Sequence, residues 1–147
     1  MGWGLSLVAH AQSTDTIGTV DPVTQPYQLG EQLYLENCAS CHIALPPAVL
    51  PTQTWQQLLQ DQNHYGVQLK PLVDPPRLLI WNYMRTFSRP RGIEEPTPYK
   101  VNDSRYFKAL HPKVKLARPV EISSCVTCHP GAAQYNFRRL SAQWQSQ

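Results

Sequence analysis

Hydrophobic residues recur with a helical period in short blocks of this chain, and the first block follows a polar N-terminal segment. Residues 12–27 are polar and interrupted by proline, so we expect an extended segment there. Beyond it, Leu29, Leu33 and Tyr34 recur at helical spacing. This pattern predicts a helix that leads directly into the sequence Cys-Ala-Ser-Cys-His.

The middle of the chain carries further helical patterns between proline-rich turns. Thr54 is suited to cap a helix that carries Trp55, extends toward His64 and stops at Gly66. Beyond Gly66 the pattern of apolar positions predicts a helix over 77–87, a short helix over 104–112 and an extended stretch over 113–123.

All four cysteines of the chain fall in two copies of the motif Cys-x-x-Cys-His. Two thiols at this spacing can form thioether bonds to the vinyl groups of one haem, and the histidine that follows is then held under the iron as its proximal ligand. Two copies in 147 residues predict two covalently bound c-type haems. The residues of the two copies are Cys38, Cys41 and His42, and Cys125, Cys128 and His129.

Other uses of paired cysteines fit this arrangement less well. The pairs of a four-cysteine zinc site usually lie ~15–20 residues apart, whereas Cys41 and Cys125 are separated by most of the chain. A thioredoxin-like redox pair belongs on a βαβ pattern, which we do not find. Structural disulfides are the plainest alternative, and they require that both histidines follow the cysteine pairs by coincidence.

The number of histidines matches what two six-coordinate irons need. Of the five, His10 lies in an apolar leader, and His42 and His129 follow the cysteines. The remaining two, His64 and His111, are therefore the candidate sixth ligands. Proximity in the sequence pairs His64 with His42 and His111 with His129, and a crossed arrangement stays open.

Met84 is the rival sixth ligand because it lies downstream of the first motif, at a distance common in small monohaem cytochromes. Its apolar helical surroundings favour packing instead. Irons held by two strong-field histidines are low-spin and closed to substrate, so the predicted chemistry is outer-sphere electron transfer without enzyme activity. The alternatives are a dihaem peroxidase-like enzyme with one labile distal ligand and a haem subunit of a larger redox complex.

The chain resembles the small dihaem cytochrome c family of bacteria between residues 30 and 140. The likeness rests on the two haem motifs, a Pro-Pro-x-x-Leu-Pro loop at 46–51, Trp55 and a His-Tyr-Gly sequence at 64–66. Members of this family are periplasmic electron carriers with bis-histidine haems. The resemblance implies redox protein partners, for which a small monohaem cytochrome and a membrane cytochrome b are the candidates.

The predicted fold is mainly α-helical with much irregular structure. It comprises a cytochrome c-like N-terminal haem region and a small, loop-rich C-terminal haem region. The 14 prolines agree with the irregular part, and the proline-rich stretch 88–98 is the best boundary. We expect a signal-peptide remnant over 1–11, an extended segment over 12–27, a first haem region over 28–90 and a second over 91–147.

The N-terminus has features of an exported protein. Residues 1–11 are largely apolar and end in Ala-His-Ala, a pattern suited to signal peptidase cleavage before Gln12. No later stretch approaches the ~20 apolar residues of a transmembrane helix. We therefore expect a soluble protein in the periplasm or an equivalent lumen, which argues against a nucleic-acid partner.

Charge is distributed unevenly along the chain, whose formal net charge is +3. The residues before Lys70 include acidic groups but no lysine or arginine, whereas the stretch from Lys100 to Arg118 has Asp103 as its one acidic residue. Such a stretch is either a solvated basic face or a docking patch for an acidic redox partner. Its basic residues are Lys100, Arg105, Lys108, Lys113, Lys115 and Arg118.

Overall fold

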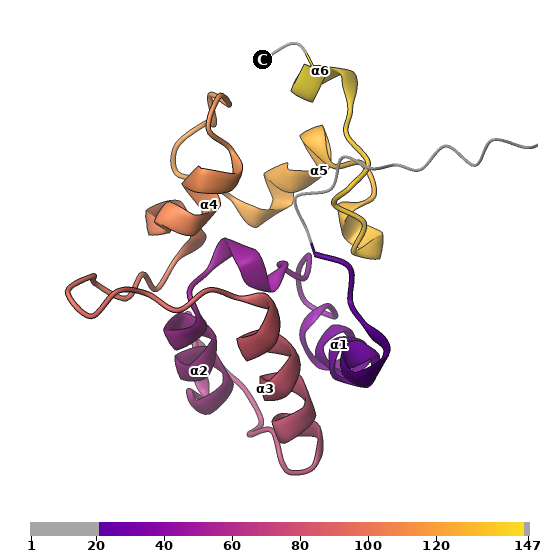
Figure 1. Ribbon diagram of the computed structural model, residues 1–147, viewed down its shortest axis with the longest axis vertical. Helices are drawn as coiled ribbons and strands as arrows, with labels where there is room; N and C mark the ends of the chain where they lie inside the picture. The colour runs from indigo at the N-terminus through magenta and orange to yellow at the C-terminus, as the bar shows by residue number, and fades with distance from the viewer. Residues whose placement is uncertain (1–20, 146–147) are drawn as a thin grey trace, which may run out of the picture.

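The computed structural model describes residues 21–145, in which helices predominate (Figure 1). The predicted signal-peptide remnant lies outside this range, as does most of the predicted extended segment. The mainly α fold with much irregular structure is confirmed. The α-helices are α1 (Gln25–Cys38), α2 (Thr52–Gln60), α3 (Pro76–Phe87), α4 (Arg105–Leu110), α5 (Cys125–Cys128) and α6 (Ala142–Gln145). The short elements are β1 (Asn63–His64) and β2 (Val67–Gln68), which pair antiparallel, and the 3-10 helices η1 (Pro47–Val49), η2 (Val101–Asp103), η3 (Ile122–Ser124) and η4 (Ala132–Gln134).

Helix α1 begins inside the segment that the sequence predicted to be extended. Thr24 precedes the helix and Pro26 occupies its first turn, where proline is tolerated because the backbone N–H has no partner to lose. The Tyr27 ring packs edge-on against Phe87 of α3, with ring centroids 5.5 Å apart. The extended prediction is therefore wrong for residues 25–27.

Helix α2 begins before the residue predicted to cap it. Pro51 precedes the helix, and its carbonyl accepts the N–H groups of Thr54 and Trp55. The Thr54 side chain is wholly buried, and its hydroxyl donates to the carbonyl of Pro98 at 2.6 Å. The prediction of Thr54 as a cap is wrong, since its hydroxyl bonds a distant loop instead.

Helix α2 also ends earlier than predicted, so that His64 lies on strand β1 and not on the helix. The Asp61 carboxylate accepts the N–H of Asn63 at 2.8 Å, and the Asn63 side chain accepts the N–H of Gly66 at 3.0 Å. Such local side-chain bonds compete with a continued helix. The chain then reverses through Tyr65 and Gly66, whose φ angles are 51° and 91°, as in a tight hairpin turn.

Helix α3 lies where a helix was predicted over 77–87, and it forms the centre of the core. Tyr83 and Met84 are almost completely buried. Helices α1 and α2 both pack against α3 in the lower half of Figure 1. A side chain at Gly30 of α1 would collide with the Leu79 carbonyl oxygen and with Tyr83, so the close crossing of α1 and α3 requires glycine there.

Helix α4 confirms the short helix predicted in the stretch 104–112. Ser104 caps it by accepting the N–H of Phe107, and the Ser104 hydroxyl also donates to the carbonyl of Val49 at 2.7 Å. Residues 113–121 of the stretch predicted to be extended are in neither helix nor strand, whereas residues 122–123 belong to η3, so the extended prediction is wrong for these two residues. None of the helices in residues 21–145 combines the length and hydrophobicity needed to cross a bilayer.

Side chains from both predicted haem regions meet in one hydrophobic core. Val101 and Phe107 belong to the same buried cluster as Tyr34. Across the same interface, the hydroxyl groups of Tyr83 and Tyr135 lie 2.7 Å apart and share a hydrogen bond. The division at residue 90 stays a prediction, and the two sides of it are packed together.

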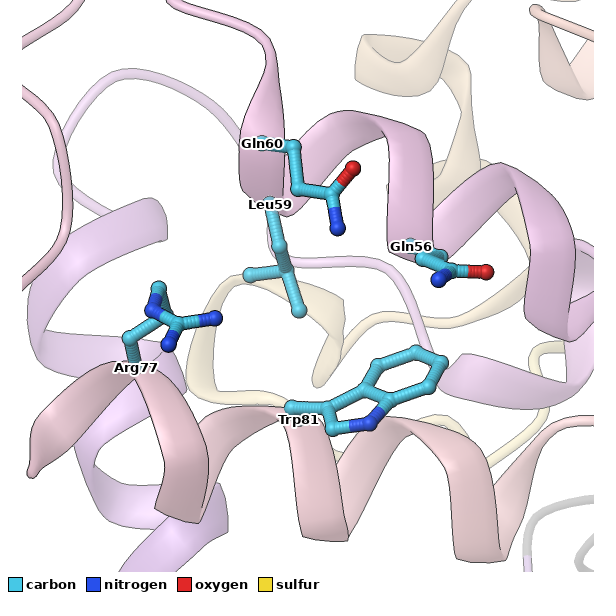
Figure 2. Close-up of a pocket in the computed structure, with 5 residues that line it drawn as sticks. All are labelled: Gln56, Leu59, Gln60, Arg77 and Trp81. Carbon is cyan, nitrogen blue, oxygen red and sulfur yellow. The ribbon is translucent and has the colours of Figure 1, made fainter. Parts of the chain in front are cut away.

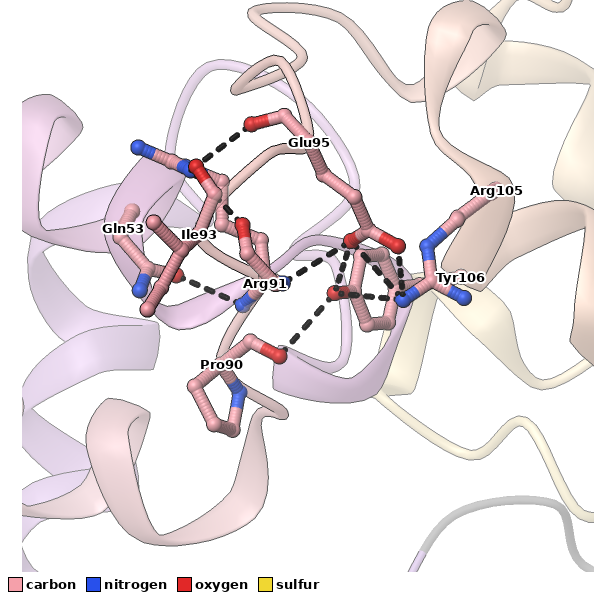
Figure 3. Close-up of polar contacts among 8 residues, drawn as sticks. Gln53, Pro90, Arg91, Ile93, Glu95, Arg105 and Tyr106 are labelled. Carbon is pink, nitrogen blue, oxygen red and sulfur yellow. Dashed lines mark hydrogen bonds and ion pairs between the residues drawn. The ribbon is translucent and has the colours of Figure 1, made fainter.

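The segment 88–98, which we call the linker, is irregular but held by many hydrogen bonds (Figure 3). The Arg91 N–H donates to the Gln53 side chain of α2 at 2.9 Å. Glu95 pairs with Arg105 of α4 at 2.8 Å. The linker is thus bonded to helices on both sides of the predicted boundary. The Arg91 guanidinium donates within the linker to the Thr97 hydroxyl and to the carbonyls of Gly92, Ile93 and Glu95.

Candidate functional site

The four histidines predicted as axial ligands form two close pairs. His42, just beyond α1, faces His64 of β1 with ring centroids 6.0 Å apart and ring planes 9° apart. His111, at the end of α4, lies 6.2 Å from His129, with ring planes 85° apart. Each motif histidine is thus paired with the candidate ligand that is nearer to it in the sequence. The crossed arrangement is not observed.

The separation within each pair fits one metal ion between two imidazoles. A metal–imidazole bond is about 2.0 Å long and the ring centre lies about 1.1 Å behind the nitrogen, so two rings on opposite sides of an ion have centroids about 6.2 Å apart. The observed values are 6.0 and 6.2 Å. Rings in direct face-to-face contact would lie about 3.5–4.0 Å apart, so the parallel pair has room for an ion.

Backbone carbonyls fix the ring orientation of three of these histidines. Because a carbonyl oxygen only accepts, the bonded Nδ1 carries the proton and leaves the lone pair on Nε2. This is the arrangement usual for metal-ligating histidines, whose second nitrogen is held by a neighbouring acceptor. The Nδ1 bonds run from His42 to Ile43, from His111 to Phe107 and from His129 to Phe137, at 2.8, 2.7 and 2.8 Å.

Burial favours the neutral form of two of the histidines. It lowers the pKa of His64, and the nearby His42 lowers it further, while Asp61 has the opposite effect. Burial also lowers the pKa of His129, against the raising effect of its bond to the Phe137 carbonyl. The neutral imidazole is the form that binds metal, so both environments suit ligation.

The second histidine pair is surrounded by aromatic rings that the sequence analysis did not single out. The ring centroid of Phe107 lies 4.3 Å from that of His111, and the ring centroid of Phe137 lies 5.5 Å from that of His129. The Trp144 ring of α6 packs near both histidines, with centroid distances of 5.8 Å to His111 and 6.1 Å to His129. These residues follow no motif, and only the fold brings them to the site.

The four cysteines lie next to the motif histidines in the sequence and form no disulfide with one another. Cys38 ends α1, and burial raises its pKa to about 11. Burial raises the pKa of Cys125 as well. A reactive dithiol of the thioredoxin type needs a lowered thiol pKa, so this alternative loses support. In the described range 21–145 no three histidine, cysteine or acidic side chains gather as a metal-ion site, so the two cysteine pairs do not meet around zinc.

The basic side chains of the stretch from Lys100 to Arg118 are exposed, but they differ in the groups that they contact. Arg105 is paired with Glu95 at 2.8 Å, and the Arg118 guanidinium donates to the Asn102 carbonyl at 2.9 Å. The ion pairs found within residues 21–145 involve Arg77, Arg89 and Arg105 as cations. The lysines of the stretch are therefore outside ion pairs. They are Lys100, Lys108, Lys113 and Lys115.

A small hollow between α2 and α3 contains none of the predicted site residues (Figure 2). Its lining has neither histidine nor cysteine, so it offers no haem ligand. The residues that line it are Gln56, Leu59, Gln60, Arg77 and Trp81.

Comparison with known proteins gives a family and two solved structures. The family model described as "Dihaem cytochrome c" matches residues 34–137. A diheme cytochrome c from Rhodobacter sphaeroides is 28% identical, covers 72% of this chain and 95% of its own, and superposes with a TM-score of 0.53. A crystal structure of DHC purified from the same bacterium is 26% identical, covers 78% and 98%, and has a TM-score of 0.51. No curated protein matches the chain.

Proposed function

This chain belongs to the dihaem cytochrome c family, and from this premise we propose that it carries electrons outside the cytoplasm through two bis-histidine haems. Membership of the family makes the chain an electron carrier with two covalently bound c-type haems. It also sets aside the peroxidase-like alternative. When bound, each haem supplies an iron that alternates between the ferric and ferrous states.

The observation that carries the proposal is the spacing of the two histidine pairs. The ring centroids of His42 and His64 lie 6.0 Å apart, so these two histidines would hold one iron; those of His111 and His129 lie 6.2 Å apart, and these two would hold the other. Cysteine thioethers would fix each haem on the side of the motif histidine. The attachment residues are Cys38 and Cys41 for the first haem, and Cys125 and Cys128 for the second.

Two histidines on each iron leave no position for a substrate. Strong-field ligation keeps the iron low-spin in both oxidation states, so little bond rearrangement accompanies a change of charge. The carbonyl partners of His42, His111 and His129 hold the rings in place and make Nε2 a better donor. Such a site favours outer-sphere electron transfer.

An electron carrier needs redox partner proteins, and the exposed lysines suggest how one docks. Lys113 and Lys115 lie on the loop that follows α4, and this loop projects beside α4 in Figure 1. The loop begins at His111, so a partner docked there would lie near the second haem. We propose an acidic partner, for which a small monohaem cytochrome or a membrane cytochrome b is the candidate.

Export from the cytoplasm is the remaining part of the proposal. The apolar run 1–11 ends in a small-x-small sequence suited to signal peptidase. Attachment of c-type haem outside the cytoplasm agrees with a periplasmic location. The remaining alternative, a haem subunit of a larger redox complex, differs from a free carrier in that the protein would copurify with its partners.

The deciding experiment uses protein matured in an export-competent host, with a haem assay and near-infrared magnetic circular dichroism. We expect two haems per chain and the charge-transfer band of bis-histidine ligation. A band typical of histidine–methionine ligation would contradict the ligand assignment and would favour Met84 as a sixth ligand.

A further inference from the structure

The strand that carries His64 has little support of its own. The sheet of β1 and β2 consists of two-residue strands, and an isolated hairpin is marginally stable in water. Its turn places Tyr65 at a φ of 51°, a left-handed conformation that a residue with a bulky side chain rarely adopts. Something beyond the hairpin therefore has to hold His64 toward His42.

His64 also lacks the orienting bond that the other three histidines have. The Nδ1 atoms of His42, His111 and His129 each contact a backbone carbonyl. Within the described part of the chain, the His64 ring makes no hydrogen bond, and its ring neighbours are His42 and Tyr65. The orientation of His64 must therefore come from the backbone that carries it.

Tyr99 contacts the residues on both sides of His64. Its hydroxyl accepts the N–H of Tyr65 at 3.2 Å and donates to the carbonyl of Asn63 at 3.4 Å. Its own carbonyl accepts the Tyr65 hydroxyl at 2.5 Å, and the two tyrosine rings lie 4.4 Å apart. These contacts bridge 34 residues of sequence and are the ones that secure the left-handed Tyr65.

Tyr99 is itself fixed by buried neighbours in the sequence. The carbonyl of Pro98 accepts the hydroxyl of Thr54, a wholly buried residue of α2. Val101 on the other side belongs to the hydrophobic core. Tyr99 thus connects the hairpin to the core of the molecule.

From these contacts we propose that Tyr99 is a positioning residue that keeps His64 on the first iron. The inference rests on the proposed function, in which His64 is a sixth ligand. Without Tyr99, the hairpin would move away from His42, and His64 would no longer keep a small molecule such as carbon monoxide from the first iron. The second iron keeps both histidines, because His111 is held by α4.

The test measures carbon monoxide binding to the reduced holoprotein by optical spectroscopy. Wild type is expected to bind none, and Tyr99→Ala to bind one molecule per chain, at least tenfold faster than any residual binding by wild type. Tyr99→Phe keeps the ring and the backbone carbonyl but loses the hydroxyl, so it should bind at an intermediate rate. Binding that stays at one molecule per chain in both variants is the readout that a general loss of stability would not produce, because general loosening would open both irons.

Tyr106→Phe is the matched control. The Tyr106 hydroxyl also bonds the linker region, through the Pro90 carbonyl and the Glu95 carboxylate, but it does not contact the hairpin. This variant should behave like wild type. Carbon monoxide binding by Tyr106→Phe equal to that of Tyr99→Phe would overturn the specific role of Tyr99.

His64→Ala separates failure of this inference from failure of the proposed function. If His64→Ala opens one iron while both Tyr99 variants stay closed, Tyr99 does not position His64 and the ligand assignment stands. If His64→Ala behaves like wild type, the ligand assignment itself fails. If Tyr99→Ala opens both irons or loses haem, that substitution disturbs the whole fold and Tyr99→Phe becomes the deciding variant. A Tyr99→Phe protein that binds no carbon monoxide would then overturn the inference.

Discussion

The two histidine pairs have nearly equal separations, 6.0 and 6.2 Å, but their ring planes differ completely in orientation, at 9° and 85°. Each site contains one copy of the same pentapeptide motif. The motif therefore determines which residues are present, and the surrounding fold determines how the rings face each other.

The surroundings of the motif histidines show how this difference arises. His42 is exposed, and its Nδ1 bonds the carbonyl of the adjacent Ile43. His129 is buried at 8% exposure, and its Nδ1 bonds Phe137, which lies beyond the turn of η4. The orientation of the His42 ring is therefore set by the adjacent backbone, whereas the orientation of the His129 ring depends on how the chain folds between His129 and Phe137.

The two candidate sixth ligands, His64 and His111, also differ in their surroundings. His64 lies on a short hairpin, where its ring neighbours that of Tyr65, and the Tyr99 hydroxyl accepts the N–H of Tyr65. His111 ends a helix, and the Phe107 and Trp144 rings lie against it. In the first site His64 is thus carried by one short hairpin, while in the second site His111 lies among aromatic rings.

Removing either distal histidine is the largest change that tests the comparison. His64→Ala and His111→Ala should each gain binding of one carbon monoxide per chain, which wild type lacks, because each variant vacates one iron. Both haems should stay attached, since attachment depends on the cysteines. Optical titration of the reduced protein with carbon monoxide checks this. A variant that stays closed would show that its histidine is not a ligand.

Electron paramagnetic resonance of the ferric protein should resolve the two ring orientations. Nearly parallel imidazoles act on the same iron d orbital and split the levels strongly, which gives a rhombic low-spin signal. Perpendicular imidazoles compensate each other and give a strongly anisotropic signal with one large g value. We expect one signal of each kind, with the rhombic signal lost in His64→Ala. Two identical signals would contradict the difference in orientation.

Gly30→Ala should destabilise the helical first region. The added methyl group would meet the Leu79 carbonyl and the Tyr83 side chain, and overpacking of this kind costs about 1–3 kcal/mol. Thermal unfolding of the holoprotein, followed by circular dichroism, measures the loss. Gly92→Ala is the control, because its methyl group would meet mainly the flexible end of Glu95. Equal losses in both variants would mean that the crossing of α1 and α3 adapts.

Charge reversal on the loop after α4 should have the smallest effect. Lys113→Glu with Lys115→Glu is expected to slow electron transfer to an acidic partner by about tenfold at low ionic strength. The difference should fade as salt shortens the screening length to about 10 Å at 0.1 M. Stopped-flow kinetics measures both. Reversal of Arg105, which is already paired with Glu95, should slow transfer less. Equal rates for wild type and the double lysine variant would leave the loop as a solvated face.

The features that the sequence predicted well are local. The helical spacing of Leu29, Leu33 and Tyr34 predicted α1, and Ser104 begins the predicted short helix as its cap. Counting histidines was enough to predict that His64 and His111 pair with the two motif histidines, because the chain has five histidines in all. Their role as iron ligands stays a prediction. Each of these inferences depends on neighbours in the sequence or on number alone.

The features that escaped prediction depend on contacts between distant residues or on competition at short range. Thr54 resembles a cap in the sequence, but its hydroxyl bonds Pro98 instead. The helical pattern toward His64 is interrupted because the Asp61 and Asn63 side chains take backbone N–H groups. Tyr99 has no local signal at all, since its role appears only when the linker brings it to the hairpin.

The firmly bonded linker has a consequence for the timing of electron transfer. Arg91 and Glu95 tie it to α2 and α4, and the hydrogen-bonded Tyr83 and Tyr135 hold the two sides together in the core. These contacts pack the two regions together, so we expect an electron that passes between the two haems to tunnel through a path of nearly fixed length. We expect the rate of such a step to be independent of solvent viscosity, because neither region has to diffuse toward the other.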